Sequence, residues 1–448
     1  MAIGPYAQWT LAQEARALLS RLARVRSFAL VEPMLPAANL LPGTQDAIER
    51  HLVVGRRQLR KAVRDFLAWL RGPAAREATA AQAQRRYTFL KLRFNAVITQ
   101  FDLFNDVISQ RSANEIGVWM SGLDVVSADA LTLPGRYYEV PPIICYLDRG
   151  IGAAIRRART RLPGGGANPV AIIRIPRERM IGNGIASSLF HEVGHQAAAL
   201  LDLVNSLRPV LQGLQRGRAS ERQAWQLWER WISEIVADFW SVARLGVSSS
   251  MGLKGVVSLP RPFVFRLNVD DPHPVPWIRV KLSCAMGNAL YPHPQWARLA
   301  DLWEQLYPID ALEPERRKLL AQLQESMPGL VTLIVNHRPK ALRGRSLAEA
   351  LGVSARQPAR LAALFAAWNG SPEQMYRASP SLVFAVLGQA SADGQLTPED
   401  ESALLAKLLT HWALRSTLDA SSARAPAAKP MQIASAAWLR RDERLTIH

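Results

Sequence analysis

Residues 187–197 read SSLFHEVGHQA, a run of apolar positions around two histidines and one acid. His191 and His195 lie four positions apart, so on a helix they share one face and their ring nitrogens can converge on one ion. Glu192 follows the first histidine directly, which angles its carboxylate beside such an ion rather than onto it. This HExxH spacing is typical of a zinc site whose carboxylate takes a proton from the metal-bound water. The alternative is an ordinary buried helix with two structural histidines.

A catalytic zinc takes three protein ligands and keeps a fourth position open, so a third ligand is needed. Residues 225–240, WQLWERWISEIVADFW, form the next helical pattern, and Glu234 and Asp238 lie one turn apart in its apolar half. Unpaired carboxylates in such a helix would each cost several kcal/mol on burial. We therefore expect Glu234 to be the third ligand and Asp238 to orient one histidine through its other ring nitrogen. The alternative is that Glu234 and Asp238 belong to an exposed acidic edge among Glu229, Arg230 and Ser233.

HExxH followed by ExxxD on a later helix resembles the gluzincin metallopeptidases. The resemblance implies a zincin core, which has an active-site helix, a ligand helix and a small sheet whose edge strand holds the substrate. Residues 169–175, PVAIIRI, are then the expected edge strand, along which an extended peptide pairs by strand addition. The 38 residues between His195 and Glu234 exceed the short gap of thermolysin-like enzymes and leave room for an extra helix or loop.

A third motif extends the resemblance. Residues 271–274 read DPHP, and Arg279 follows His273 by six positions, which resembles the His-Pro…Arg element of prenyl-protein endopeptidase-like gluzincins. Those relatives are commonly membrane-embedded, so the resemblance covers about residues 165–290 and not the flanks. Groups opposite the zinc would stabilise a developing oxyanion. The candidates are His273, Arg279, Tyr137, Tyr138 and Tyr291. The alternative for His273 is a loop histidine without a role.

The resemblance implies a zinc-dependent endopeptidase that acts on a protein or peptide substrate. Zn²⁺ on His191, His195 and Glu234 would lower the pKa of its water to about 7 and polarise the scissile carbonyl. Glu192 would accept the water proton and later deliver it to the leaving amine.

The rest of the chain is mainly helical in pattern. Residues 46–71 and 81–108 carry apolar side chains at helical spacing, whereas residues 137–147 and 169–175 are short, β-branched and bounded by Pro or Gly. We expect a predominantly helical α+β protein with a zincin-like core and a small sheet. The expected domains are an N-terminal helical domain (1–115), the metallopeptidase domain (116–311), a C-terminal helical domain (312–418), and a flexible linker and tail (419–448).

Composition excludes several classes of protein. Lys and Arg number 55 against 37 Asp and Glu, a net charge of +18 that suggests acidic partners or surfaces. Cys145 and Cys284 form no disulfide framework, which favours a reduced compartment, and we expect the protein to be cytoplasmic. We find no signal peptide and no apolar run of about 18 residues, so we expect no membrane insertion. A secreted disulfide scaffold, a membrane channel and a disordered tail protein are excluded.

A rival class rests on residues 347–365, LAEALGVSARQPARLAALF, which resemble a helix-turn-helix. The second helix would offer only Arg356, Gln357 and Arg360 to base edges before it turns apolar. The rival is therefore a basic helical binding or assembly protein, with nucleic acid as a candidate ligand and a non-catalytic zincin core. We favour a structural helical hairpin, do not expect nucleic-acid binding, and expect residues 312–418 to bind a protein partner or shield the site.

Overall fold

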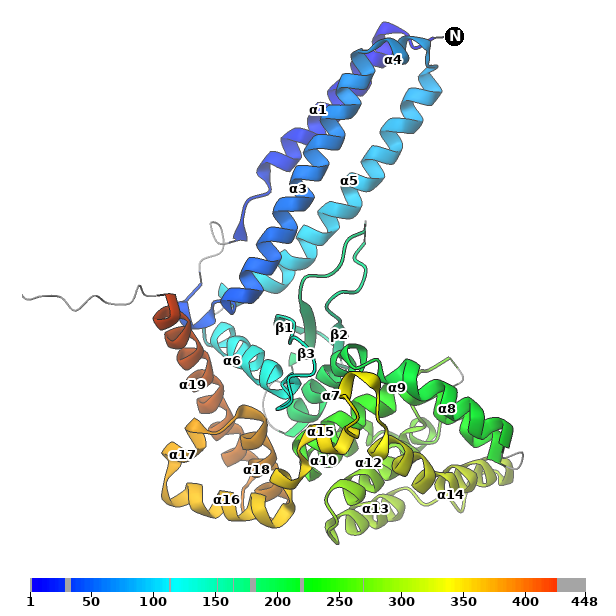
Figure 1. Cartoon of the computed structure of the whole chain (residues 1–448), viewed down its shortest axis with the longest axis vertical. Helices are drawn as coiled ribbons and strands as arrows, with labels where there is room; N and C mark the ends of the chain where they lie inside the picture. Colours follow the sequence, from blue (N-terminus) through cyan, green and yellow to red (C-terminus); the bar gives the residue numbers. More distant parts are fainter. Residues whose placement is uncertain are drawn as a thin grey trace, which may run out of the picture.

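The computed structural model describes residues 2–28, 34–112, 114–150, 152–163, 165–177, 183–217, 221–268 and 270–424. It is predominantly helical with one small three-stranded sheet, which confirms the predicted α+β class. Figure 1 shows a long helical stalk that rises from a broad helical body, with the sheet at their junction. No helix in the described part of the chain is long and apolar enough to cross a membrane.

The stalk consists of α1 (Pro5–Arg24), α3 (Pro42–Arg71) and α5 (Ala80–Ile108), joined at the tip by α4 (Pro73–Glu77). It packs around its own apolar cluster, which includes Leu18, Val63 and Phe94. A capping box, in which the Thr79 side chain and Gln82 bind each other's backbone N–H, begins α5. The helices predicted at 46–71 and 81–108 are therefore confirmed.

The sheet contains β1 (Ile143–Asp148), β2 (Ala154–Arg156) and β3 (Ala171–Pro176) in the order β1-β3-β2. β1 pairs with β3 in parallel, whereas β2 pairs with β3 antiparallel, with Ile155 opposite Ile173. The strand predicted at 137–147 begins only at residue 143. Pro141 and Pro142 precede it, and proline has no N–H to donate to a ladder.

The prediction that residues 169–175 form the edge strand is wrong. They form β3, the central strand, with β1 on one side and β2 on the other. Ala171, Ile172, Ile173 and Ile175 are all buried, and burial on both faces is typical of a strand inside a sheet. The short strand β2 is therefore the edge on the side that pairs antiparallel.

The body is built from helices that surround the metal-site motifs. They are α6 (Asn114–Leu131), α7 (Asn183–Leu200), α8 (Leu203–Gly217), α9 (Arg222–Leu245), α10 (Val247–Val257), α11 (Arg261–Val264), α12 (Pro276–Leu290), α13 (Gln295–Leu306) and α14 (Pro314–Asn336). The extra element expected between His195 and Glu234 is α8, which packs against α9. Short 3₁₀ helices lie at Pro36–Ala38, Ser109–Ser112, Lys340–Leu342 and Val353–Arg356.

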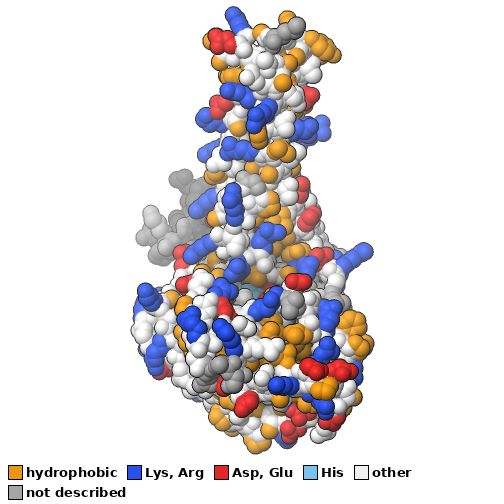
Figure 2. All heavy atoms as spheres, turned by 90° about the vertical axis from the view of Figure 1, so that its right-hand side faces the viewer, with side chains coloured by type: hydrophobic (Ala, Val, Ile, Leu, Met, Phe, Trp, Pro, Cys, Tyr) orange, Lys and Arg blue, Asp and Glu red, His pale blue; other side chains and the backbone are white. Residues whose placement is uncertain are grey.

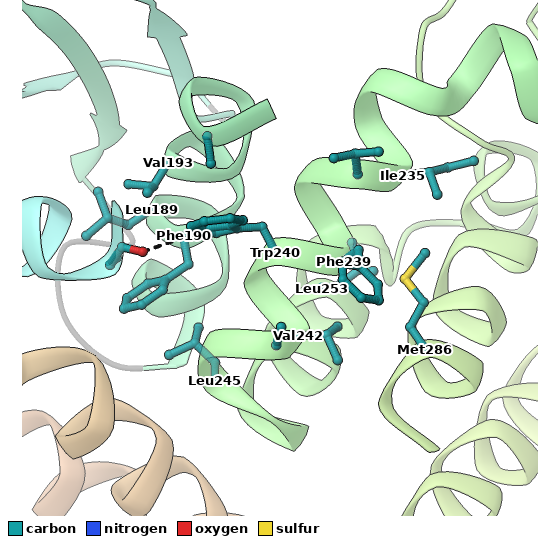
Figure 3. Packing of buried hydrophobic residues seen from close by; sticks show 14 of the residues in the cluster. Leu189, Phe190, Val193, Ile235, Phe239, Trp240, Val242, Leu245, Leu253 and Met286 are labelled. Carbon is teal, nitrogen blue, oxygen red and sulfur yellow. Dashed lines mark hydrogen bonds between the residues drawn. The ribbon is translucent and has the colours of Figure 1, made fainter. Parts of the chain in front are cut away.

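The crossing of α7 and α9 is unusually close at Gly194. A side chain there would place its first carbon 2.8 Å from the Ala237 Cα, so only glycine allows the two backbones to approach this far. Apolar residues on both sides of the crossing, among them Leu189, Phe190 and Trp240, fill the interior (Figure 3). This packing fixes the histidine face of α7 against the acidic face of α9.

The C-terminal helices are α15 (Leu347–Leu351), α16 (Pro358–Gly370), α17 (Pro372–Arg377), α18 (Pro380–Ala392) and α19 (Pro398–Arg424). Two of these helices begin with side-chain caps, since Ser346 binds the Glu349 N–H and Thr397 binds the Asp400 N–H. One apolar core extends from α6 to α19, and the Phe190 and Phe384 rings lie 6.0 Å apart within it.

The predicted linker needs a correction at its start. α19 continues to Arg424, so residues 419–424 are helical rather than a flexible linker, because the helix runs on past the Ala and Ser residues of this segment. Residues 425–448 lie outside the described part of the chain.

Candidate metal centre

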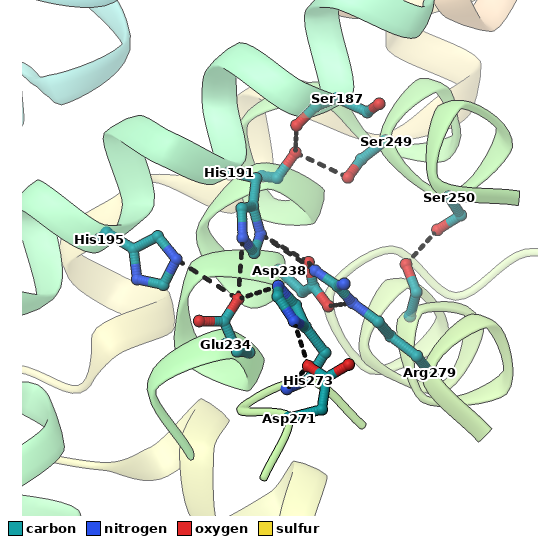
Figure 4. A network of polar contacts seen from close by, with 12 residues as sticks. Ser187, His191, His195, Glu234, Asp238, Ser249, Ser250, Asp271, His273 and Arg279 are labelled. Carbon is teal, nitrogen blue, oxygen red and sulfur yellow. Dashed lines mark hydrogen bonds and ion pairs between the residues drawn. The ribbon is translucent and has the colours of Figure 1, made fainter. Parts of the chain in front are cut away.

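Two helices bring the three candidate ligands together at one point. His191 and His195 come from α7, and Glu234 comes from α9 (Figure 4). The Glu234 Oε2 atom lies 3.1 Å from His191 Nε2 and 3.4 Å from His195 Nε2. One donor atom from each residue lies within 4.8 Å of the other two. The prediction that these three side chains converge is confirmed.

The spacing of these atoms suits a metal ion. Two atoms bound to a tetrahedral zinc at about 2.0–2.1 Å lie about 3.3–3.4 Å apart. The two imidazole-to-carboxylate distances are close to that value. Two imidazoles and one carboxylate are also a donor set that a divalent transition metal favours. The residues present therefore fit the implied metal.

A buried ion pair orients the first histidine. Asp238 Oδ1 lies 2.7 Å from His191 Nδ1, and the Arg279 guanidinium binds both oxygens of the same carboxylate at 2.7 and 2.9 Å. A proton on Nδ1 satisfies Asp238, so that Nε2, which faces Glu234, could give up its own proton and bind a metal ion. Burial acts to raise the Asp238 pKa, but the charges of Arg279 and His191 outweigh it and hold the pKa below its usual range.

The carboxylates make this point strongly favourable for positive charge. Burial acts to raise the Glu234 pKa, but hydrogen bonds from His191, His195 and His273 lower it well below its usual range. For His191, burial acts to lower the pKa, yet the charge of Asp238 and the hydrogen bonds of both acids raise it to about 9. A cation at the same point would meet the same attraction.

Glu192 lies beside the ligands, as its position in the motif predicts. The residue is only 7% exposed, and this burial raises the pKa of its carboxyl. It lines a cavity of about 120 Å³ between α7, α9 and α10. A buried carboxyl with a raised pKa is suited to take up and return a proton near neutral pH.

His273 and Arg279 both reach the site, but they do different things there. His273 Nε2 lies 3.2 Å from Glu234 Oε2, while its Nδ1 lies 2.7 Å from Asp271 Oδ1. Its side chain is 46% exposed at the rim of the cavity. Arg279 is instead held by Asp238 and lies behind His191. Of the two, His273 is the one placed to meet a substrate.

The tyrosines proposed for the same role lie elsewhere, so that expectation is wrong. The Tyr291 hydroxyl donates to Ala243 O at 2.6 Å in the core, and the Tyr138 hydroxyl donates to Leu131 O. Tyr137 lies beneath the guanidinium of Arg343. None of the three lines the cavity, because long-range packing directs each ring into the interior or onto another segment.

Sequence reasoning missed several residues around the cavity. Asp271 holds His273, and Gln196 accepts the Ala158 N–H at 2.8 Å, which ties the loop after β2 to α7. Ser187 was detectable, because it precedes His191 by four positions on the same helix face. Ser188, next to Ser187, also lines the cavity. The other lining residues come from segments that the motifs do not mark: Gly152, Ala153, Ser241, Ser249, Leu253 and Val256.

The helix-turn-helix-like segment is tied into the body. The guanidinium of Arg356 is buried and donates to Arg244 O at 2.9 Å and to Ser381 O at 3.0 Å. The Gln357 side chain donates to Leu290 O at 3.3 Å. Two of the three side chains considered for base edges thus serve internal contacts, and Arg360 alone is exposed.

Comparison of this chain with models of protein families, with curated proteins and with solved structures finds no match. The candidate centre therefore rests on its own geometry and on the resemblance of its motifs.

Proposed function

We propose that this chain is a zinc-dependent endopeptidase. The observation that carries the proposal is the convergence of His191, His195 and Glu234 on one point beside the buried carboxyl of Glu192. The donor set suits zinc, and the neighbouring acid suits hydrolysis rather than a purely structural metal site. A structural zinc site has four protein ligands and needs no base beside it.

Each residue then has a role that its contacts support. His191, His195 and Glu234 hold the zinc, which when bound supplies a Lewis acid that polarises a carbonyl and acidifies water. Glu192 accepts a proton from the attacking water and passes it to the leaving amine. The proton thus moves from the water to the Glu192 carboxylate and then to the leaving amine, all within the cavity.

The Asp238–Arg279 ion pair and His273 assist the proposed hydrolysis. Asp238 and Arg279 keep His191 in one orientation, because each binds the other through two hydrogen bonds. His273 acts as an imidazolium: its Nδ1–H donates to Asp271, and its Nε2–H donates to the oxygen on which negative charge develops. His273 was one of the five candidates for this role, and the three tyrosines among them do not line the cavity.

The substrate is an extended protein segment that pairs along β2. Gly152 and Ala153, which line the cavity with His191 and Glu192, lead directly into this strand. Peptides commonly add to an exposed sheet edge through backbone hydrogen bonds. Cytoplasmic localisation and a protein partner for residues 312–418 stay predictions of the sequence.

The Glu192→Gln variant tests the mechanism. We expect its hydrolysis of an unfolded protein substrate to fall about 10²- to 10⁴-fold, because the amide cannot accept the water proton. Metal analysis should still find one zinc per chain, since Glu192 is not a ligand. Glu315→Gln, an exposed acid on α14, is the matched control and should hydrolyse as the wild type does.

Two results would contradict the proposal. Near-normal turnover by Glu192→Gln would remove the proposed base. Equal zinc content in the wild type and a folded His195→Ala variant would show that the metal, if bound, lies at another site.

A further inference from the structure

The strand at the rim of the cavity leads into a strongly basic segment. Residues 149–177 contain seven arginines and no acidic residue. Four of these arginines lie in or directly after β2, and all four are exposed: Arg156, Arg157, Arg159 and Arg161. A peptide that pairs along β2 would therefore pass close to these guanidinium groups.

The backbone that carries these arginines is held rigidly. The Asn168 side chain, which is 1% exposed, donates to Arg156 O at 3.3 Å and to Arg157 O at 3.2 Å. The Arg159 N–H donates to Asn168 O at 2.8 Å. Gln196, the residue after His195, accepts the Ala158 N–H. The arginines are thus held at a fixed distance from the ligand helix α7.

The guanidinium groups themselves are not neutralised by the protein. In the described part of the chain, no carboxylate lies within ion-pair distance of Arg156, Arg157, Arg159 or Arg161. Among the described residues of 149–177, an ion pair is found only at Arg174, which lies 3.7 Å from Asp148. Exposed arginines with a fixed backbone and no internal partner are available to bind anionic groups.

The stalk adds charge of the same sign. Its helix α5 has no acid between Ala80 and Phe101 but carries Arg85, Arg86, Lys91 and Arg93. The base of the stalk reaches the basic segment, since the Gln100 side chain donates to Gly165 O at 3.2 Å. Figure 2 shows basic side chains along the stalk and around its junction with the body. Charges arranged in this way draw an anionic ligand toward the junction.

We propose that β2 and the arginines that follow it form a subsite for acidic segments of the peptide substrate. This inference rests on the proposed endopeptidase function and names its substrate class. Antiparallel pairing on β2 would run the peptide from Arg157 toward Gly152, so its Asp or Glu residues lie on the N-terminal side of the bond at the cavity. We favour a peptide over nucleic acid because the arginines flank a strand edge that offers backbone hydrogen bonds.

Binding is measured with the full chain carrying Glu192→Gln, so that no peptide is consumed. Two labelled peptides share an apolar centre and differ only in four N-terminal positions, which are Asp or Glu in one and Asn or Gln in the other. We expect the acidic peptide to bind about tenfold more tightly by fluorescence anisotropy at low salt. The difference should shrink as salt rises, because exposed charges are screened.

Matched variants locate the effect. Arg156→Gln/Arg157→Gln should lose most of the preference for the acidic peptide. Arg316→Gln/Arg317→Gln removes the same charge from the exposed start of α14 and should keep the preference. Arg156→Glu/Arg157→Glu should favour a lysine-containing peptide instead. Circular dichroism of each variant checks that the fold is retained.

Three outcomes would overturn the subsite. Equal binding of the two peptides, or an unchanged preference in Arg156→Gln/Arg157→Gln, removes it. Duplex DNA of scrambled sequence is added as a competitor of the acidic peptide at physiological salt. If it displaces the peptide from the Glu192→Gln protein but does not bind when Arg156→Gln/Arg157→Gln is also present, these arginines bind nucleic acid instead. The proposed function is tested separately, by cleavage with the wild type. If the wild type cleaves both peptides equally, the proposed hydrolysis is supported and the subsite is not. If the acidic peptide binds but is never cleaved, the subsite is supported and the proposed hydrolysis is not.

Discussion

Two buried arginine–aspartate pairs lie in the body of this protein, and they differ in what the aspartate binds next. Arg111 and Asp124 lie at the base of the stalk, with side chains that are 0% exposed. Arg279 and Asp238 lie at the candidate metal centre, with side chains that are 11% and 9% exposed. The same two residue types thus occur once in a fully closed environment and once beside a cavity, where the side chains keep slight exposure to solvent. We call the first the closed pair and the second the open pair.

The third partner separates the two pairs. Arg111 donates to Cys145 O at 2.7 Å, and Asp124 accepts the Cys145 N–H at 2.7 Å, so this pair ends on the backbone of β1. Asp238 instead binds His191, whose other ring nitrogen faces Glu234. The first pair positions a strand and the second positions a ligand. A buried ion pair is therefore informative about function only through the group that it orients.

The largest effect is expected at the closed pair. Arg111→Met leaves the Asp124 carboxylate buried without its cation, which should lower the free energy of unfolding by about 3–5 kcal/mol. Zinc affinity of the folded fraction should stay near that of the wild type, because no ligand is touched. Urea unfolding and zinc titration measure the two quantities. Unchanged stability, or zinc affinity that falls with it, would break the distinction between the pairs.

A smaller effect is expected at the open pair. Asp238→Asn keeps the shape of the side chain but removes the charge that orients His191, so zinc affinity should fall by about 10–100-fold. Stability should fall less than in Arg111→Met, because the cavity lets water reach Arg279. Competition with a metal chelator gives the affinity. If zinc affinity is unchanged while stability collapses, Asp238 has the same structural role as Asp124.

The smallest effect concerns the response of the closed pair to pH. Burial outweighs the opposing charge of Arg111 and raises the Asp124 pKa above its ordinary value of about 4. The folded state then holds this proton more tightly than the unfolded chain, so the contribution of Asp124 to stability rises as pH falls through the raised pKa. Compared with Asp124→Asn, the wild type should gain stability on acidification from neutral pH toward about pH 4, the ordinary pKa of an aspartate. A loss relative to this variant would show that the pKa is lowered.

Much of the candidate site was readable from local spacing. The i, i+4 histidines and the i, i+4 acids predict which side chains share a helix face, and α7 and α9 present them as expected. The caps at Ser346 and Thr397 are equally local, because each side chain binds an N–H three residues later. These features depend on contacts within one or two turns, so short windows of sequence contain the information that they need.

The place of each strand in the sheet and the roles of several side chains depended on contacts between distant segments. Residues 169–175 look like any short buried strand, and whether such a strand lies inside the sheet or at its edge depends on where β1 and β2 pair. Tyr291 was a candidate for stabilising an oxyanion, and Arg356 was a candidate for contacting DNA bases. Either side chain can instead form hydrogen bonds inside the core. Packing against Ala243, Arg244 and Ser381 assigned them to the core instead.

The sequence by itself thus specified which side chains could bind a metal, because helical periodicity determines which side chains of a helix point in the same direction. Their convergence required the close crossing at Gly194, where two helices far apart in sequence approach backbone to backbone. The position of the basic segment beside the cavity likewise required Asn168 and Gln196 to anchor it. Local geometry follows from chain stereochemistry, whereas the meeting of remote segments follows from the burial and shape of the whole core.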